Sequence, residues 1–273
     1  MAEFKPIKDI SRERICELAD NAASLFRDGV RPIYASTLRG SPEHIGSCIA
    51  LKQGDTPYLL TAAHVIDWND VSSLYIGDGE LHQLSMDFYA TIKPDGDRDA
   101  DHFDFAIGKL PDSDVAALAG TKFINGENIE RNIGYVPGQT YTSIGYPNSK
   151  NKKIDNQNRI APATLFHHTG VAKQDSDLVQ KLGVSGMEHI LISQNAKYSL
   201  DATGRKVSSV NLRGMSGGAV IGLGNLADPN VLAGRVNPTP LLAGVFIEFH
   251  RDHSAIVATR LDAILKAKGL MFP

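Results

Sequence analysis

The feature that most restricts the fold is the run of short apolar segments that begins after Gly29. Segments such as RPIYAST (31–37), PYLLTAAHVI (57–66), DFAIGKL (104–110) and TYTSIGY (140–146) are rich in β-branched and aromatic residues, and turn residues separate them. This spacing is typical of antiparallel sheets folded into barrels or sandwiches. A parallel sheet would require helices that alternate with the strands, and the pattern lacks them. We therefore predict an all-β fold.

Each end of the chain carries one helical pattern. From 9 to about 27, apolar residues recur every three or four positions, which predicts an amphipathic helix. Near the other end, Ile256, Leu261, Ile264 and Leu265 fall on one helical face, and lysines precede Gly269, as a helix C-terminus favours. We expect a helix from 256 onward. The polar interval 148–158 predicts a loop, and 175–182 a short helical turn.

Composition limits the class of partner and the compartment. The 273 residues are 42% hydrophobic, enough for a sizeable core, and the net charge of -3 shows no basic excess of the kind that binds nucleic acid or an anionic membrane. Two cysteines, Cys16 and Cys48, cannot supply a disulfide framework, although one bridge between them is conceivable. The first twenty residues carry acids and lysines where a secretory leader needs an apolar run. We expect a cytoplasmic location.

The stretch GMSGGAVIG (214–222) places three glycines around Ser216, directly before an apolar strand. A nucleophilic serine needs a sharply turned backbone whose N–H groups converge where negative charge develops, and glycines permit such a turn. An ordinary tight turn that contains a serine is the alternative. GVSGM offers a second serine, Ser185, but no strand follows it. Ser216 is therefore the candidate nucleophile.

A histidine and an aspartate supply the other groups that an activated serine requires. His64 follows an apolar strand and small residues in YLLTAAHVI, so a rigid element would aim its imidazole as a general base. A structural, hydrogen-bonded histidine is the alternative. Asp104 precedes the apolar run FAIGKL, where its carboxylate could accept the Nδ1 proton of His64. Asp101, three residues earlier, is its rival.

TAAHV (61–65), DFAI (104–107) and GMSGGAV (214–220), in this order, resemble the motifs of trypsin-like (chymotrypsin-fold) serine peptidases, including bacterial trypsin-like peptidase domains. The resemblance spans about 31–249. It implies two six-stranded antiparallel β-barrels at 30–125 and 126–255, between a helical extension at 1–29 and a C-terminal helix at 256–273. It also implies a triad of His64, Asp104 and Ser216, an oxyanion hole from the N–H groups of Gly214 and Ser216, and no cofactor or metal.

The same resemblance suggests where substrate binds. Val210, six residues before Ser216, corresponds to the floor of the specificity pocket, and it gives no support for a preference for basic residues. VFIEF (245–249), which includes Ile247, resembles the strand that pairs with the substrate backbone, and Phe249 could narrow the pocket. Arg213 could line the rim or be an ordinary surface arginine. The N-terminal activation sequence and the disulfides of many secreted members have no counterpart.

The resemblance implies a serine endopeptidase that acts on peptide or protein substrates, with a regulatory protein partner conceivable. Two other functions remain open. GMSGG fits the nucleophile elbow of α/β-hydrolase esterases, but that fold needs its acid and histidine after the serine. A catalytically silent module that binds extended peptides along VFIEF is the second. EFHRDH also suggests a metal site from Glu248, His250 and His253, although polar residues at a strand end explain the pattern more simply.

Overall fold

Two sheets form the body of the protein in this computed structural model, which describes residues 5–37, 40–131, 134–155, 160–194, 205 and 210–270. The first sheet has the order β6-β4-β1-β2-β3-β8-β7, with β9 beside β2. Its pairings are antiparallel except for β9. The strands are β1 (Val30–Ser36), β2 (Pro42–Gln53), β3 (Thr56–Ala62), β4 (Leu74–Ile76), β6 (His82–Gln83), β7 (Tyr89–Ala90), β8 (Phe105–Lys109) and β9 (Ile124–Asn125).

The second sheet is antiparallel throughout and has the order β12-β10-β14-β15-β16-β13. Its strands are β10 (Gln139–Gly145), β12 (Phe166–Val171), β13 (His189–Ser193), β14 (Ala219–Asn225), β15 (Leu241–His250) and β16 (Ala255–Arg260). A bridge between Ala172 and Ile192 connects the two edge strands, which closes this sheet into a barrel. A separate small sheet joins β5 (Gly79–Glu80) to β11 (Ile160–Ala161).

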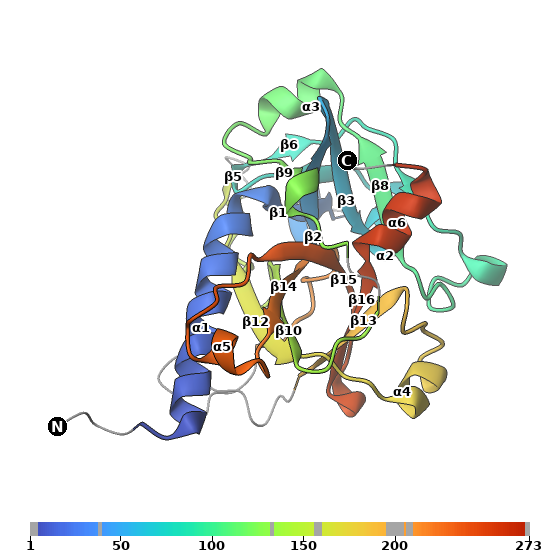
Figure 1. Ribbon diagram of the computed structural model, residues 1–273. Helices are drawn as coiled ribbons and strands as arrows, with labels where there is room; N and C mark the ends of the chain where they lie inside the picture. Colours follow the sequence, from blue (N-terminus) through green and yellow to red (C-terminus); the bar gives the residue numbers. More distant parts are fainter. Residues whose placement is uncertain are drawn as a thin grey trace.

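The predicted all-β, chymotrypsin-like architecture is confirmed. The second sheet has the six expected strands, whereas the first has eight in the described part, because two- and three-residue strands extend its edges. Segments this short bury too few side chains to produce a visible apolar pattern. Figure 1 shows the first sheet above the second, and the chain passes from one to the other through the segment that follows β9.

Six α-helices lie around the sheets in the described chain. They are α1 (Ile7–Phe26), α2 (Ala63–Ile66), α3 (Asp112–Ala117), α4 (Ser176–Lys181), α5 (Pro229–Leu232) and α6 (Leu261–Lys268). Short 3-10 turns occupy Arg27–Gly29, Asp67–Asp70, Pro94–Gly96, Gly126–Asn128 and Arg251–His253. The N-terminal helix and the turn near 175–182 match their predictions. No helix of the described residues is long and apolar enough to cross a membrane.

The C-terminal helix begins five residues later than predicted. Residues 255–260 form β16, which pairs with β15 on one side and β13 on the other, and α6 starts only at Leu261. The apolar positions in AIVATR fit either structure over so short a length. Pairing on both sides favours the strand, because it satisfies the backbone hydrogen bonds of a fully buried segment.

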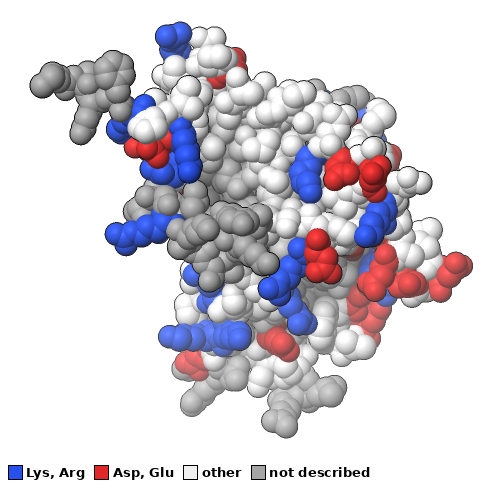
Figure 2. All heavy atoms as spheres, turned by 90° about the horizontal axis from the view of Figure 1, so that it is seen from below, with Lys and Arg blue, Asp and Glu red and all other residues white. Residues whose placement is uncertain are grey.

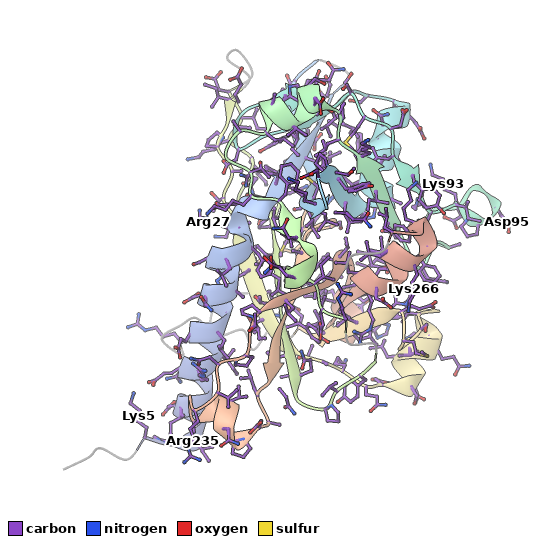
Figure 3. All side chains as sticks on the ribbon, turned by 45° about the horizontal axis from the view of Figure 1, so that its top comes forward. Lys5, Arg27, Lys93, Asp95, Arg235 and Lys266 are labelled. Atoms are coloured by element: carbon purple, nitrogen blue, oxygen red, sulfur yellow. The ribbon has the colours of Figure 1, made fainter. Side chains whose placement is uncertain are left out.

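Helix α1 packs along the second sheet, as Figure 1 shows. Its buried Arg14 donates from Nε to the Val231 carbonyl at 3.1 Å and from Nη2 to the Val236 carbonyl at 3.2 Å. These bonds tie α1 to the segment around α5. In Figure 3, Lys5 and Arg27 mark the two ends of this helix, and Arg235 lies beside the first. The predicted helix is thus a covering element of the barrel, held by a charged residue as well as by apolar contacts.

The face seen from below in Figure 2 carries both basic and acidic side chains, with the two signs interspersed. The structure directs attention to the junction of the two sheets, where the predicted site residues lie.

Candidate active site

His64 lies in α2, directly after β3 ends at Ala62. The prediction placed it at a strand end, and the structure puts it two residues beyond that end. The strand is buried from Leu59 to Ala62, so it fixes the start of the helix, while the imidazole remains 38% exposed. The ring is thus held by a rigid element and is still open to solvent.

Asp104 binds the Nδ1 side of the His64 imidazole. Its Oδ2 lies 2.6 Å from His64 Nδ1, and its Oδ1 accepts the His64 backbone N–H at 2.8 Å. The carboxylate is 4% exposed, and its residue sits immediately before β8 with φ +39°, a left-handed conformation that is uncommon for a non-glycine residue. Strained backbone of this kind clusters at functional sites. The carboxylate fixes both the orientation of the ring and the nitrogen that carries the proton.

Asp101, the rival acid, has a supporting position. It pairs with Arg98 at 2.5 Å, and its Oδ1 accepts the N–H groups of Phe103 and Asp104, each at 3.2 Å. These bonds hold the turn that presents Asp104 to the imidazole. Of the two acids, the structure therefore brings Asp104, the predicted one, to His64.

The surroundings of the pair set its protonation. Burial alone would lower the pKa of His64, but the hydrogen bond and charge of Asp104 outweigh it, helped by the more distant charges of Glu248 and Asp67, and the pKa is raised above its ordinary value of 6.5. Burial raises the pKa of the Asp104 carboxyl, against the hydrogen bonds and charge of His64 that lower it. The carboxylate thus stabilises the protonated form that His64 reaches when it takes a proton as a general base.

The turn that carries Ser216 is fixed to the first sheet by a buried serine, Ser47. The Ser47 N–H donates to the Ser216 carbonyl at 2.8 Å, and its hydroxyl donates to the Gly214 carbonyl at 3.1 Å. The same hydroxyl accepts the N–H of Tyr146 at 3.0 Å. Ser47 was not among the predicted site residues, although it lies in the short apolar segment GSCIAL (46–51). One side chain thus joins both sheets to the turn.

Gly46 lies against Val65, the residue after His64 in α2, and against the Ser216 carbonyl. A methyl group at Gly46 would lie 2.6 Å from the Val65 side chain and 3.2 Å from the Ser216 carbonyl. Only a glycine allows α2 and the serine turn to approach β2 so closely. The Ser216 hydroxyl donates to the Ile247 carbonyl at 3.1 Å, and no bond between this hydroxyl and His64 occurs in the described part. The structure thus places Asp104 against His64 and turns the Ser216 hydroxyl toward β15.

Two backbone donors at this turn have no acceptor within the described chain. Neither the Gly214 nor the Ser216 N–H donates to another described residue. Gly214 has φ +93° and Gly217 has φ +83°, a conformation that glycine adopts at no steric cost. Backbone N–H groups without an acceptor can bind a developing oxyanion where they point to one place. Both predicted donors are therefore available for that role.

The predicted substrate-binding residues lie in different places. Ile247 is buried and offers its carbonyl to Ser216, and Phe249 packs against the core of the second barrel. Arg213 is exposed and lines a cavity of about 530 Å³ with His44, Asn148 and Lys152. Val210 is partly exposed, and 206–209 before it lie outside the described residues. The cavity that Arg213 lines does not include Phe249 among its lining residues.

The remaining candidates have other surroundings. Ser185 donates its N–H to His189 Nδ1 at 3.1 Å, away from the His64 pair. Cys16 and Cys48 do not form the conceivable disulfide with each other. Glu248 and His250 form an ion pair at 2.5 Å, but no group of three potential metal ligands gathers in the described chain. None of these residues competes for the role of Ser216 or His64.

Gly217 provides a test of how tightly the turn is packed. A methyl group there would lie 2.0 Å from the Ser47 carbonyl oxygen and 2.2 Å from Thr61 Oγ1. Gly217→Ala should destabilise the fold by more than ~3 kcal/mol, because it adds a backbone clash to a left-handed conformation. Chemical denaturation monitored by circular dichroism measures this loss.

Gly96 is the matched control, since it has the same φ of +83° but open space at its Cβ position. Gly96→Ala should cost only the conformational penalty, about 1–2 kcal/mol. Equal losses in the two variants would contradict a tightly packed serine turn.

Comparison with known proteins supports the fold alone. No family model matches the chain, and no curated protein matches it. A scabies mite inactivated protease paralogue has 13% sequence identity and a TM-score of 0.52, over 91% of this chain and 95% of that one. An HtrA-type protease, AlgW, in a variant form with a tripeptide, has 17% identity and a TM-score of 0.51, over 92% of this chain and 62% of that one.

The architecture is therefore that of the trypsin-like and HtrA-type serine proteases. At these identities the likeness extends to the fold and leaves the activity to be argued from the site. One of the two similar structures is described as inactivated, so the fold by itself does not imply catalysis.

Proposed function

We propose that the protein is a serine endopeptidase that cleaves peptide bonds through an acyl-enzyme, with Ser216 as nucleophile, His64 as general base and Asp104 as the orienting acid. The observation that carries the proposal is the 2.6 Å contact between His64 Nδ1 and Asp104 Oδ2. It leaves Nε2 with its lone pair on the exposed side of the ring. A neutral imidazole in this tautomer can accept the proton of a serine hydroxyl.

The first step requires the Ser216 hydroxyl to leave Ile247. A rotation about its Cα–Cβ bond between staggered positions releases the hydroxyl and turns it away from β15. As Oγ attacks the substrate carbonyl, His64 takes the hydroxyl proton and then gives it to the leaving amine. In the second half of the reaction, His64 takes a proton from the water that attacks the acyl-enzyme. It then gives this proton to Oγ of Ser216 as the serine leaves.

The N–H groups of Gly214 and Ser216 would stabilise the negative charge on the substrate oxygen. Each is free of other acceptors in the described residues, and Ser47 fixes the turn that bears them. A donor aimed at the developing charge contributes roughly 10² to 10³ in rate.

An extended peptide or protein segment is the substrate class that suits β15. Its pairing with β14 ends at Val245, whereas its pairing with β16 continues to His250. One edge of β15 near Glu248 and Phe249 is therefore unpaired in the described chain. An open strand edge recognises extended peptides by backbone hydrogen bonds. We further propose a cytoplasmic enzyme restrained by a narrow pocket or a regulatory protein partner.

A fluorophosphonate probe tests the proposal directly. The probe should label the wild-type protein at a single site, and Ser216→Ala should abolish labelling, because only an activated serine reacts. Mass spectrometry of the tryptic peptides locates the adduct. Equal labelling of both proteins would remove Ser216 from the mechanism.

A catalytically silent peptide-binding module is the second candidate. It is favoured by the bond from Ser216 to Ile247, since the hydroxyl is engaged away from the imidazole. A silent module would resist the probe but still bind peptides, and substitution of Ser216 would not change that binding. Isothermal calorimetry with a library of extended peptides separates this outcome from catalysis.

A further inference from the structure

The Arg213–Gly214 peptide unit determines where the first oxyanion donor points. This bond is trans, as are all those in the described chain, so the Arg213 carbonyl and the Gly214 N–H point in opposite directions. The Arg213 carbonyl accepts the N–H of Asn148 at 2.8 Å. While that bond holds, the Gly214 N–H is directed away from Asn148. Without it, the peptide unit can rotate and put a carbonyl where the donor should be.

Asn148 is itself anchored by a side chain from the other sheet. Its Oδ1 lies 2.7 Å from Nδ1 of His44, a buried residue of β2. Because an amide oxygen only accepts, Nδ1 carries the proton of this bond. The asparagine also covers Gly214 closely, since a methyl group there would lie 2.9 Å from the Asn148 nitrogen. His44 therefore fixes the residue that fixes the Arg213 carbonyl.

The environment of His44 keeps this bond constant. Its ring packs edge-on against Tyr34, with the centroids 5.4 Å apart and the planes at 75°. Burial lowers the pKa of His44 to about 4, against the hydrogen bond to Asn148 and the contact with the Gly46 backbone. The imidazole is thus neutral at every pH where His64 can act as a base. It serves as a fixed hydrogen-bond donor.

We propose that His44 and Asn148 are positioning residues for the oxyanion hole: His44 clamps the Asn148 side chain, and the Asn148 N–H holds the Arg213 carbonyl so that the Gly214 N–H faces the reacting carbonyl. The inference rests on the proposed function. It assigns a role in the transition state to a contact between β2 of the first sheet and the turn after β10, about a hundred residues apart in the chain.

Two substitutions at position 44 separate the donor from the ring. His44→Phe keeps a ring against Tyr34 but removes the donor, and His44→Asn removes the ring but places an amide N–H near the position of Nδ1. The acylation rate constant at saturating p-nitrophenyl acetate should fall ~10- to 100-fold in His44→Phe and recover in His44→Asn. The half-saturating ester concentration should stay within about twofold, because the clamp acts on the transition state.

Asn148→Ala removes the acceptor of the same clamp at a half-buried position, so it decides the question even where His44→Phe fails to fold. It should show the same fall in acylation rate and in fluorophosphonate labelling rate. His168→Phe, on β12, is the matched control and should acylate at the wild-type rate. Melting temperatures confirm that each variant is folded.

The outcomes are distinct. Wild-type acylation in His44→Phe and Asn148→Ala would overturn the positioning role while the proposed function stands. A slower His44→Asn than His44→Phe would assign the effect to ring packing instead. Failure of the wild-type protein to react with either the ester or the probe would overturn the proposed function, and this assignment with it.

Discussion

Replacing His64 with alanine should lower the turnover number for peptide hydrolysis by a factor on the order of 10⁴ or more. Without the imidazole, no group near Ser216 in the described chain can take the proton of its hydroxyl, because the Ile247 carbonyl that now accepts this hydroxyl is not a base. Single-turnover hydrolysis of an activated ester measures the loss, at the pH at which the wild-type protein is most active.

The combination with Ser216→Ala is more informative than either variant alone. Residues that act as one unit lose their whole contribution when any member is removed. The double variant should therefore be no slower than His64→Ala, within about threefold. A further fall by several orders of magnitude would mean that the two residues act independently.

His82 provides a matched control for His64. It also forms a histidine–aspartate pair, with Nε2 3.2 Å from Oδ1 of Asp114, and its side chain is 34% exposed against 38% for His64. It lies on β6 at the edge of the first sheet, and the serine beside it, Ser85, donates its hydroxyl to Asp114. His82→Ala should keep wild-type turnover. A comparable loss in this variant would show that the effect comes from histidine pairs in general.

The fold was predictable where local pattern and tertiary pairing agree. The apolar segments around β3, β8, β10 and β14 were correctly predicted as strands. Each buries enough consecutive side chains to leave an apolar pattern in the sequence. AIVATR was misread as helix because its structure is decided by β13 and β15, which are distant in sequence. The two-residue strands at the edges carry no periodic signal.

The candidate site was predictable as a set of residues and not as a set of contacts. His64, Asp104 and Ser216 each lie in a short motif, so their residue types and order are visible in the chain. The bond from Ser216 to Ile247 and the Ser47 contacts depend on how two sheets meet. No local pattern encodes contacts of that kind.

Replacing Asp104 with asparagine should lower turnover by a factor on the order of 10⁴ at neutral pH. Asparagine is close to aspartate in size, so the turn held by Asp101 should persist. Its amide can donate to Nδ1 of His64, which would move the ring proton to Nε2 and leave no lone pair for the serine. Stopped-flow acylation by an activated ester measures this loss, and the melting temperature shows whether the fold is kept.

The wild-type protein and Asp104→Asn should also differ in how kcat/KM depends on pH. Only neutral His64 can accept a proton, so activity falls as the pH drops through the pKa of that imidazole. Because the Asp104 carboxylate outweighs burial and raises the pKa of His64, half-maximal kcat/KM of the wild type should lie above pH 6.5. In Asp104→Asn the carboxylate no longer opposes the effect of burial, so the pKa of His64 should be lower. The residual activity should therefore fall only at lower pH.

Asp114→Asn is the control for this shift, since it removes a buried carboxylate that pairs with a different histidine, His82. Its acid limb should match that of the wild type. If Asp104→Asn and the wild type share one acid limb, then the titrating group is not His64, because no change of its partner could leave its pKa in place. If the fall of kcat/KM at acid pH shifts in Asp104→Asn but not in Asp114→Asn, the group that titrates is the His64 imidazole.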